Sequence, residues 1–154
     1  MSLKENIAIE RYKYILSKLL FLDDAIYKNM SSFSKIFISI ITAQGVAIFT
    51  NLKTGSKIVT DTLEVITLIA PYLLLILCIF YLCLTLSNLF SWFNYRDEEV
   101  ELLEKLNIDL GRKRPSWNSW YRWSETWFII FMVCTILIVN FRYDYIISAI
   151  TTNI

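Results

Sequence analysis

The residues that could do chemistry in this sequence include a short run of closely spaced carboxylates. The stretch "NYRDEEVELLEKL", residues 94–106, sets one arginine, Arg96, among four acids: Asp97, Glu98, Glu99 and Glu101. If several copies of the chain surrounded an axis, these acids could form rings that attract cations. A solvated helix face shows the same pattern. The run therefore predicts an acidic ring or a docking patch for a cytoplasmic partner, with plain solvation as the simpler interpretation.

The residue types that are missing exclude whole classes of chemistry. The chain has no histidine, which removes Ser-His-Asp and Cys-His catalysis, histidine-ligated metal sites and histidine proton relays. Its three cysteines, Cys78, Cys83 and Cys134, lie in apolar runs, where a thiol behaves as a small hydrophobic group. The sequence contains no nucleophile–base pair and no Gly-rich phosphate loop. We therefore expect no enzymatic activity, no cofactor and no metal.

Charge excludes one further partner. With 15 basic and 14 acidic residues, the net charge is +1, so the chain has no overall positive field that would recruit nucleic acid. We expect no direct contact with nucleic acid.

A second run combines indoles with cations. The segment "RPSWNSWYRWSETW", residues 114–127, holds four tryptophans at spacings of three, three and four. They are Trp117, Trp120, Trp123 and Trp127, and the basic triplet before them is Arg112, Lys113 and Arg114. This order is typical of the water–lipid boundary. Packing against the rest of the protein is an alternative, and an aromatic ligand cage is another, although a single helical stripe does not converge on a point as a cage must.

The elements that must position these residues are membrane-spanning helices. Hydrophobic residues make up 56% of the 154 residues, which is typical of a small membrane protein. Three segments are long and apolar enough to cross a bilayer: residues 33–52, 65–93 and 127–146. A cytoplasmic helix over residues 4–30 precedes the first, and an interfacial tryptophan segment over residues 116–126 precedes the third. We predict an all-α fold with three transmembrane helices in a single domain, residues 1–154.

The second span should continue beyond the membrane. Pro71 suits the start of a helix and Gly111 suits its end, and no proline or glycine lies between them. The sequence therefore predicts a helix that runs on to residue 110. Two apolar stripes at helical spacing, one on each side of the predicted hairpin, can pack together. The first is Tyr12, Ile15, Leu19, Leu22 and Ile26, and the second is Val100, Leu103, Leu106 and Leu110. We expect a long antiparallel helical hairpin that extends into the cytoplasm.

Orientation follows from the basic residues near the ends of the spans. Five precede the first span and six lie between the second and third, against two in the first connection and one after the third span. Positive charge stays on the cytoplasmic side. The N-terminus should therefore be inside and the C-terminus outside.

Polar residues inside the predicted spans are the remaining candidates, because they tend to face protein or water rather than lipid. They are Ser39, Thr42, Gln44, Gly45, Asn88 and Asn140. Thr135 lies in the same predicted span as Asn140. Packing between helices is the simpler explanation of these residues. The sharper hypothesis is a pore lined by the Ser39, Thr42 and Gln44 side of the first span.

The layout as a whole resembles a known kind of protein. A helical segment "ERYKYILSKLLFLDD", a juxtamembrane "WFNYRDEEVELLEKL", and then a proline and tryptophans before an acidic residue are similar to small bacterial membrane proteins of the SLATT and RipA-like type. The clear third span departs from the two-span members, and the lack of histidine excludes a HEPN-type RNase site. The resemblance implies a membrane effector in anti-phage defence, which in some members is a ring-shaped oligomer.

Three functional hypotheses result. The first is a homo-oligomeric membrane effector that gates or perturbs the lipid bilayer and is controlled by a soluble cytoplasmic partner. The second is a membrane sensor or scaffold that recruits such a partner and has no pore. The third is an immunity protein against a membrane-active toxin.

Overall fold

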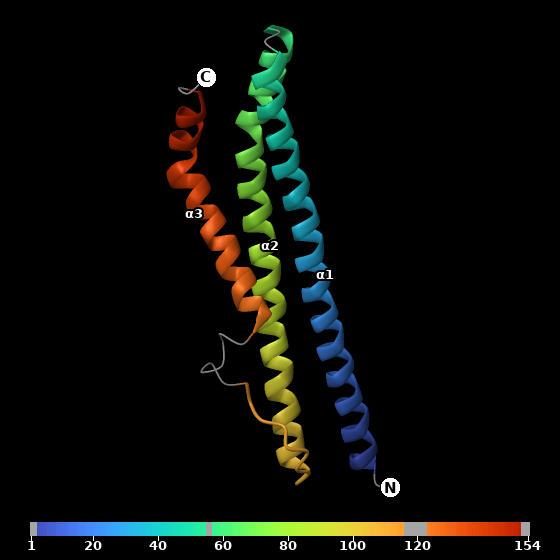
Figure 1. The fold of residues 1–154 in the computed structure, drawn as a ribbon. Helices are drawn as coiled ribbons and strands as arrows, with labels where there is room; N and C mark the ends of the chain where they lie inside the picture. The colour runs from blue at the N-terminus through green and yellow to red at the C-terminus, as the bar shows by residue number, and fades with distance from the viewer. Residues whose placement is uncertain (1–2, 55–56, 116–122, 152–154) are drawn as a thin grey trace. The chain divides into compact units, whose positions relative to one another are not determined.

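The described part of the chain is helical wherever it has regular structure. A computed structural model describes residues 3–54, 57–115 and 123–151, with side chains described except at residues 4, 51–54, 57–64, 66–67 and 142–151. It contains α1 (Leu3–Thr54), α2 (Lys57–Lys105) and α3 (Ser124–Thr151), and no strand in the described ranges (Figure 1). All three are long and apolar enough to cross a membrane. The predicted all-α class with three candidate spans is therefore confirmed.

The helices extend beyond the predicted segments at every end except the C-terminal end of α2. α1 joins residues 4–30 and 33–52 into one helix of 52 residues, because no glycine or proline interrupts residues 3–44. Its Ser34 hydroxyl also donates to the Met30 carbonyl, 2.8 Å away, without breaking the helix. α2 begins well before Pro71, which lies inside the helix and leaves a carbonyl of the preceding turn without its usual donor. α3 runs past the predicted limit of residue 146.

The other end of α2 contradicts the prediction of a helix to residue 110. The helix ends at Lys105, because Asn107 takes a left-handed conformation with φ 52°. The Asn107 N–H then donates to the Glu104 carbonyl and the Ile108 N–H to the Leu103 carbonyl, both at 3.1 Å. These bonds satisfy carbonyls that a helix end would leave open. Asparagine tolerates this backbone region better than most residues.

Contacts group the chain into two compact units. The polar unit comprises residues 1–29 and 84–127, and the apolar unit comprises residues 30–83 and 128–154. In the polar unit, α1 buries Ile15, Leu19, Leu22 and Ile26, and α2 buries Phe93, Val100 and Leu103. The two helices run antiparallel there, since Arg11 pairs with Glu98 and the Tyr14 ring lies against that of Tyr95.

Two residues of the predicted stripe do not join this core. Leu106 is 39% exposed and Leu110 is 54% exposed. Both follow the end of α2, so the helical spacing on which the prediction rested no longer applies to them. The other members of the two stripes are buried, except for the half-buried Tyr12.

The apolar unit is built around one phenylalanine. Phe33 of α1 is 1% exposed, and its ring centroid lies 5.6 Å from that of Tyr81 on α2 and 5.1 Å from that of Phe128 on α3. Cys78 and Met132 complete the buried cluster, each fully buried. Among the described side chains of this unit, Lys35 is the one that carries charge.

Candidate functional site

The predicted acidic run contains a carboxylate that is sealed inside the polar unit. Glu99 has no exposed surface, and the Arg96 guanidinium forms an ion pair with it from one turn earlier on α2. The Tyr12 hydroxyl of α1 donates to the same carboxylate at 3.5 Å, and Arg112 Nε lies 3.8 Å from it. A buried charge is tolerated only with such partners. Glu99 therefore ties together α1, α2 and the segment after α2.

That segment, residues 106–115, returns along α2, and we call it the strap. Besides Arg112 at Glu99, Arg114 donates to Glu104 at 3.4 Å. Gly111 has φ 65°, and its N–H donates to the Asp109 carboxylate at 2.8 Å. The strap and the end of α2 line an open groove of about 420 Å³ whose walls include Val100, Leu103 and Ile108.

The five residues of the predicted docking set do not act as one surface. Glu98 receives the Arg11 side chain at 2.8 Å, and Glu99 faces inward with Arg96. Glu101 pairs with Lys105 at 2.7 Å, and this hydrogen bond lowers the pKa of Glu101. Asp97 is exposed and forms no ion pair among the described residues. An acidic ring could therefore draw on Asp97 and Glu101 but not on the buried Glu99.

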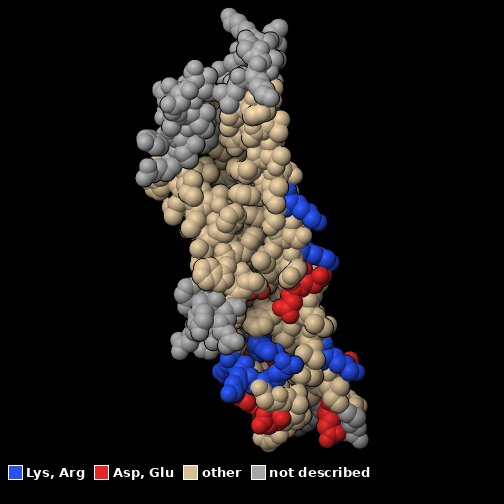
Figure 2. Space-filling view, viewed as in Figure 1, with Lys and Arg blue, Asp and Glu red and all other residues tan. Residues whose placement is uncertain are grey.

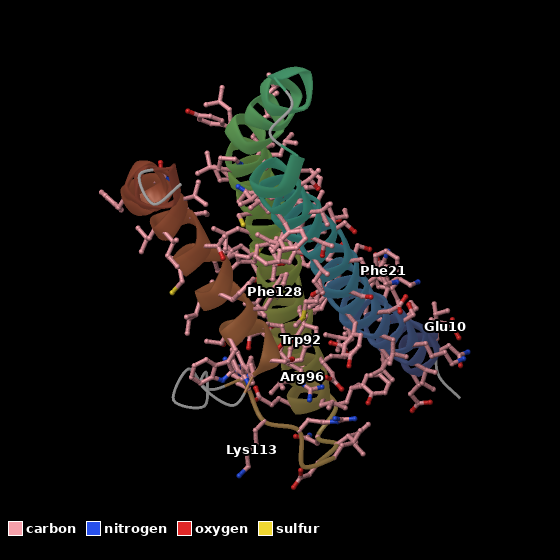
Figure 3. The ribbon with its side chains drawn as sticks, turned by 45° about the horizontal axis from the view of Figure 1, so that its top comes forward. Glu10, Phe21, Trp92, Arg96, Lys113 and Phe128 are labelled. Atoms are coloured by element: carbon pink, nitrogen blue, oxygen red, sulfur yellow. The ribbon has the colours of Figure 1, made fainter. Side chains whose placement is uncertain are left out.

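Sequence reasoning missed a contact between a tryptophan and an acid. Trp92 lies one turn before Arg96 on α2 (Figure 3), with the guanidinium 5.8 Å from the ring centroid. The Asp23 carboxyl group of α1 lies close to this indole. Desolvation raises the pKa of Asp23, Glu125 adds to this effect, and the Trp92 indole and the Arg96 charge oppose it. The residue types in "LDD" and "WFNYR" gave no sign of this pairing, because the two stretches lie far apart in the sequence.

The predicted lipid-interface residues have mixed surroundings. Trp117 and Trp120 lie outside the described residues. The Trp123 ring packs at 5.3 Å from that of Phe93, while Trp127 is 61% exposed. In the basic triplet, Arg112 and Arg114 face acids of α2, whereas Lys113 extends away from the strap (Figure 3). Two of the three cations therefore hold the strap, a role that a triplet of basic residues did not suggest.

The polar residues predicted on the first span divide between two faces of α1. Ser39 and Thr42 are exposed, and Gly45 has open space where a side chain would project. Gln44 is half-buried, because at 100° per residue it lies about 140° from Ser39 and 160° from Thr42. Ser39 and Thr42 therefore share a face that excludes Gln44, which lies on the face that carries Phe33.

The polar candidates on the other helices are bonded to their own backbone or partly covered. The Asn140 amide donates to the Ile136 carbonyl at 2.8 Å, and the Thr135 hydroxyl donates to the Phe131 carbonyl at 2.9 Å. Asn88 is half-buried. Thr85, which the sequence reading did not single out, is fully buried on α2, and its hydroxyl has no hydrogen-bond partner in the described part of the chain.

The described residues contain no group of three His, Cys, Asp or Glu that could hold a metal ion. Comparison with known proteins returned no matching family model, curated protein or solved structure. The geometry of the chain itself is therefore the basis for its function.

Proposed function

We propose that this chain is a homo-oligomeric protein of the bacterial inner membrane that gates or perturbs the bilayer, with the polar unit in the cytoplasm. The observation that carries the proposal is a polar face on α1 inside a helix apolar enough to cross a membrane. Its polar members, Ser32, Lys35, Ser39 and Thr42, recur at spacings of three and four. The apolar Val46 follows at the same spacing, and all five residues are exposed. We call them the α1 outer face.

This face is a poor surface to present to lipid tails and a good one to present to another helix or to water. Lys35 has no ion-pair partner among the described residues, and an ionisable residue near a membrane segment marks a functional site more often than a packing site. Ser39 and Thr42 are small, which permits the close helix approach that drives association in membranes. The spacing of three and four is that of helices packed at a shallow angle.

Anti-phage defence, as the biological setting, is supported by the layout resemblance alone. A membrane effector of that kind depolarises the infected cell. A sensor or scaffold without a pore would instead protect the cell while the membrane potential holds, and its soluble partner would do the damage.

The first test is membrane potential, followed with a voltage-sensitive dye in bacteria that produce the chain, with and without phage challenge. We expect depolarisation by the natural sequence and its loss in a Ser39→Leu, Thr42→Leu double variant. Ser34→Leu is the matched control. Ser34 and Ser39 are both exposed, and each donates to the carbonyl four residues earlier at 2.8 Å, but Ser34 lies about 140° away from Ser39 around the helix.

Two results would overturn the proposal. A potential that holds under every condition while the cells are protected excludes membrane perturbation and leaves the sensor or scaffold. Equal loss of depolarisation in Ser34→Leu and in the double variant would show that the α1 outer face has no specific role in depolarisation.

A further inference from the structure

The strap carries three consecutive cations, Arg112, Lys113 and Arg114, which we call the strap cations. All three are exposed. Lys113 extends away from the strap (Figure 3) and forms no ion pair among the described residues. Figure 2 shows lysine and arginine side chains clustered at the surface of the polar unit, with acidic side chains nearby. The strap therefore offers one cation that is open to a ligand and two that contact acids of α2.

The two arginines are held by longer contacts than the other ion pairs of the polar unit. Arg112 Nε lies 3.8 Å from a Glu99 carboxylate oxygen, and Arg114 donates to Glu104 at 3.4 Å. The ion pairs inside α1 and α2 that involve lysine measure 2.7 or 2.8 Å. A strong charge-assisted hydrogen bond is about 2.7–2.9 Å long, and ion pairs exposed to water contribute little to stability. A more highly charged anion can therefore take the two arginines from α2 at little cost.

Apolar packing does not hold the strap on α2 either. Ile108 is 47% exposed and Leu110 is 54% exposed, and the strap and the end of α2 line an open groove of about 420 Å³ instead of closing on each other. Gly111, whose φ is 65°, directly precedes the strap cations. Because glycine has no side chain, its backbone can change conformation without strain. The strap cations can therefore leave α2 by rotation at Gly111, while the backbone hydrogen bonds of Asn107 and Ile108 keep the end of α2 in place.

Release of Arg112 does not leave the buried Glu99 without partners. The Arg96 guanidinium still forms an ion pair with Glu99, and the Tyr12 hydroxyl still donates to it at 3.5 Å. A buried carboxylate that loses its only counter-charge is strongly destabilising, but this one keeps an ion pair within the helix pair. The cost of release is thus limited to the two long contacts of the strap.

We propose that the strap is a phosphate-binding latch. Its three cations leave Glu99 and Glu104 and bind the oxygens of phosphate groups, which arginine contacts through two parallel hydrogen bonds and lysine contacts as a point charge. An anionic lipid headgroup and a soluble polyphosphate both offer this chemistry. The place of the strap cations in the sequence, just before the tryptophan run, favours the headgroup.

This inference goes beyond the proposed function, because it concerns the polar unit alone and holds whether or not the chain depolarises cells. The test measures the position of the strap in the full chain, held in lipid nanodiscs. Nitroxide labels on Pro115→Cys and Asp97→Cys, in a chain whose three natural cysteines are replaced by alanine, report the distance between the strap and α2 by pulsed electron paramagnetic resonance.

Three conditions distinguish the sources of phosphate. Discs of phosphatidylcholine are compared with discs of equal parts phosphatidylcholine and phosphatidylglycerol, and with phosphatidylcholine discs that receive sodium tripolyphosphate. We expect a longer distance in at least one of the two anionic conditions, and that condition identifies the source. Sodium chloride at the ionic strength of the tripolyphosphate solution controls for screening of the ion pairs and should leave the distance unchanged.

Two pairs of variants separate exchange at the latch from simple attraction of an anion. Lys113→Gln removes the open cation and should raise the concentration of the effective anion at half-opening about fivefold. Lys105→Gln is its control, because it removes an exposed lysine that pairs with Glu101 inside α2, and it should leave that concentration unchanged. Glu104→Gln frees Arg114 and should lower the concentration about threefold. Its control is Glu101→Gln, which removes an acid that holds Lys105 rather than the strap.

The inference is overturned by a distance that stays the same in both anionic conditions, or by sodium chloride that opens the strap as far as tripolyphosphate does. Equal effects of Lys113→Gln and Lys105→Gln, or of Glu104→Gln and Glu101→Gln, would also overturn it, because phosphate would then bind without displacing the strap. A strap that opens in a chain that never depolarises cells keeps the latch and loses the proposed function.

Discussion

At the scale of single residues, adjacent acids in one short run have different roles. Asp97 is exposed, Glu98 binds Arg11 across the helix pair, and Glu99 is fully buried. Because successive helical positions differ by 100°, three consecutive residues must point in three directions. The sequence identified the run but could not assign a direction to each acid, since that depends on where α1 and the strap pack.

We therefore expect Glu99 to contribute more to the stability of the fold than the acids beside it. Glu99→Gln leaves the mostly buried Arg96 guanidinium without its counter-charge, and it also removes the charge that faces the half-exposed Arg112. We expect this change to lower the free energy of unfolding by about 3 kcal/mol. The measurement is unfolding in mixed detergent micelles, followed by tryptophan fluorescence.

The control for this prediction is Asp97→Asn, studied at a protein concentration where the chain is monomeric. The same change of carboxylate to amide at an exposed site should leave unfolding nearly unchanged. Equal losses at both positions would mean that the burial of Glu99 contributes nothing to stability.

At the scale of elements, the long helices were predictable and their ends were not. Apolar length identified three candidate spans, and the stripe Ile15, Leu19, Leu22 and Ile26 identified the buried face of α1. The end of α2 was missed because Gly111 looked like the stop signal. The chain turns earlier, at Asn107, and Gly111 serves the strap instead. An asparagine that ends a helix and one inside a helix look the same in the sequence.

The two asparagines allow a paired test of that helix end. Asn107→Ala places an alanine at φ 52° and should lower the free energy of unfolding by about 1 kcal/mol. Asn94→Ala, at an exposed position inside α2, should raise it by about 0.5 kcal/mol through better helix propensity. Unfolding in mixed micelles measures both, again with monomeric protein. The same sign at both positions would contradict the left-handed turn at Asn107.

At the scale of the whole molecule, the distribution of charge distinguishes the polar unit from the apolar unit. Among the described side chains, the apolar unit carries charge only at Lys35, whereas the polar unit holds every ion pair that the described residues form. A helix pair that carries such charges is suited to water, and helices without them are suited to lipid. The candidate sites follow this division. The α1 outer face lies in the apolar unit, and the buried Glu99 with its partners lies in the polar unit.

This division makes the orientation of the chain measurable. The excess of basic residues before the first span and between the second and third predicts that the polar unit lies in the cytoplasm. In a background with Cys78, Cys83 and Cys134 replaced by alanine, we expect Gly55→Cys to react with a membrane-impermeant maleimide in intact spheroplasts. Asp97→Cys should react only after the membrane is permeabilised. The reverse pattern would invert the orientation and place the polar unit outside the cell. Labelling of both positions in intact spheroplasts would mean that α2 does not separate them across the membrane, which would remove the basis for a pore through the first span.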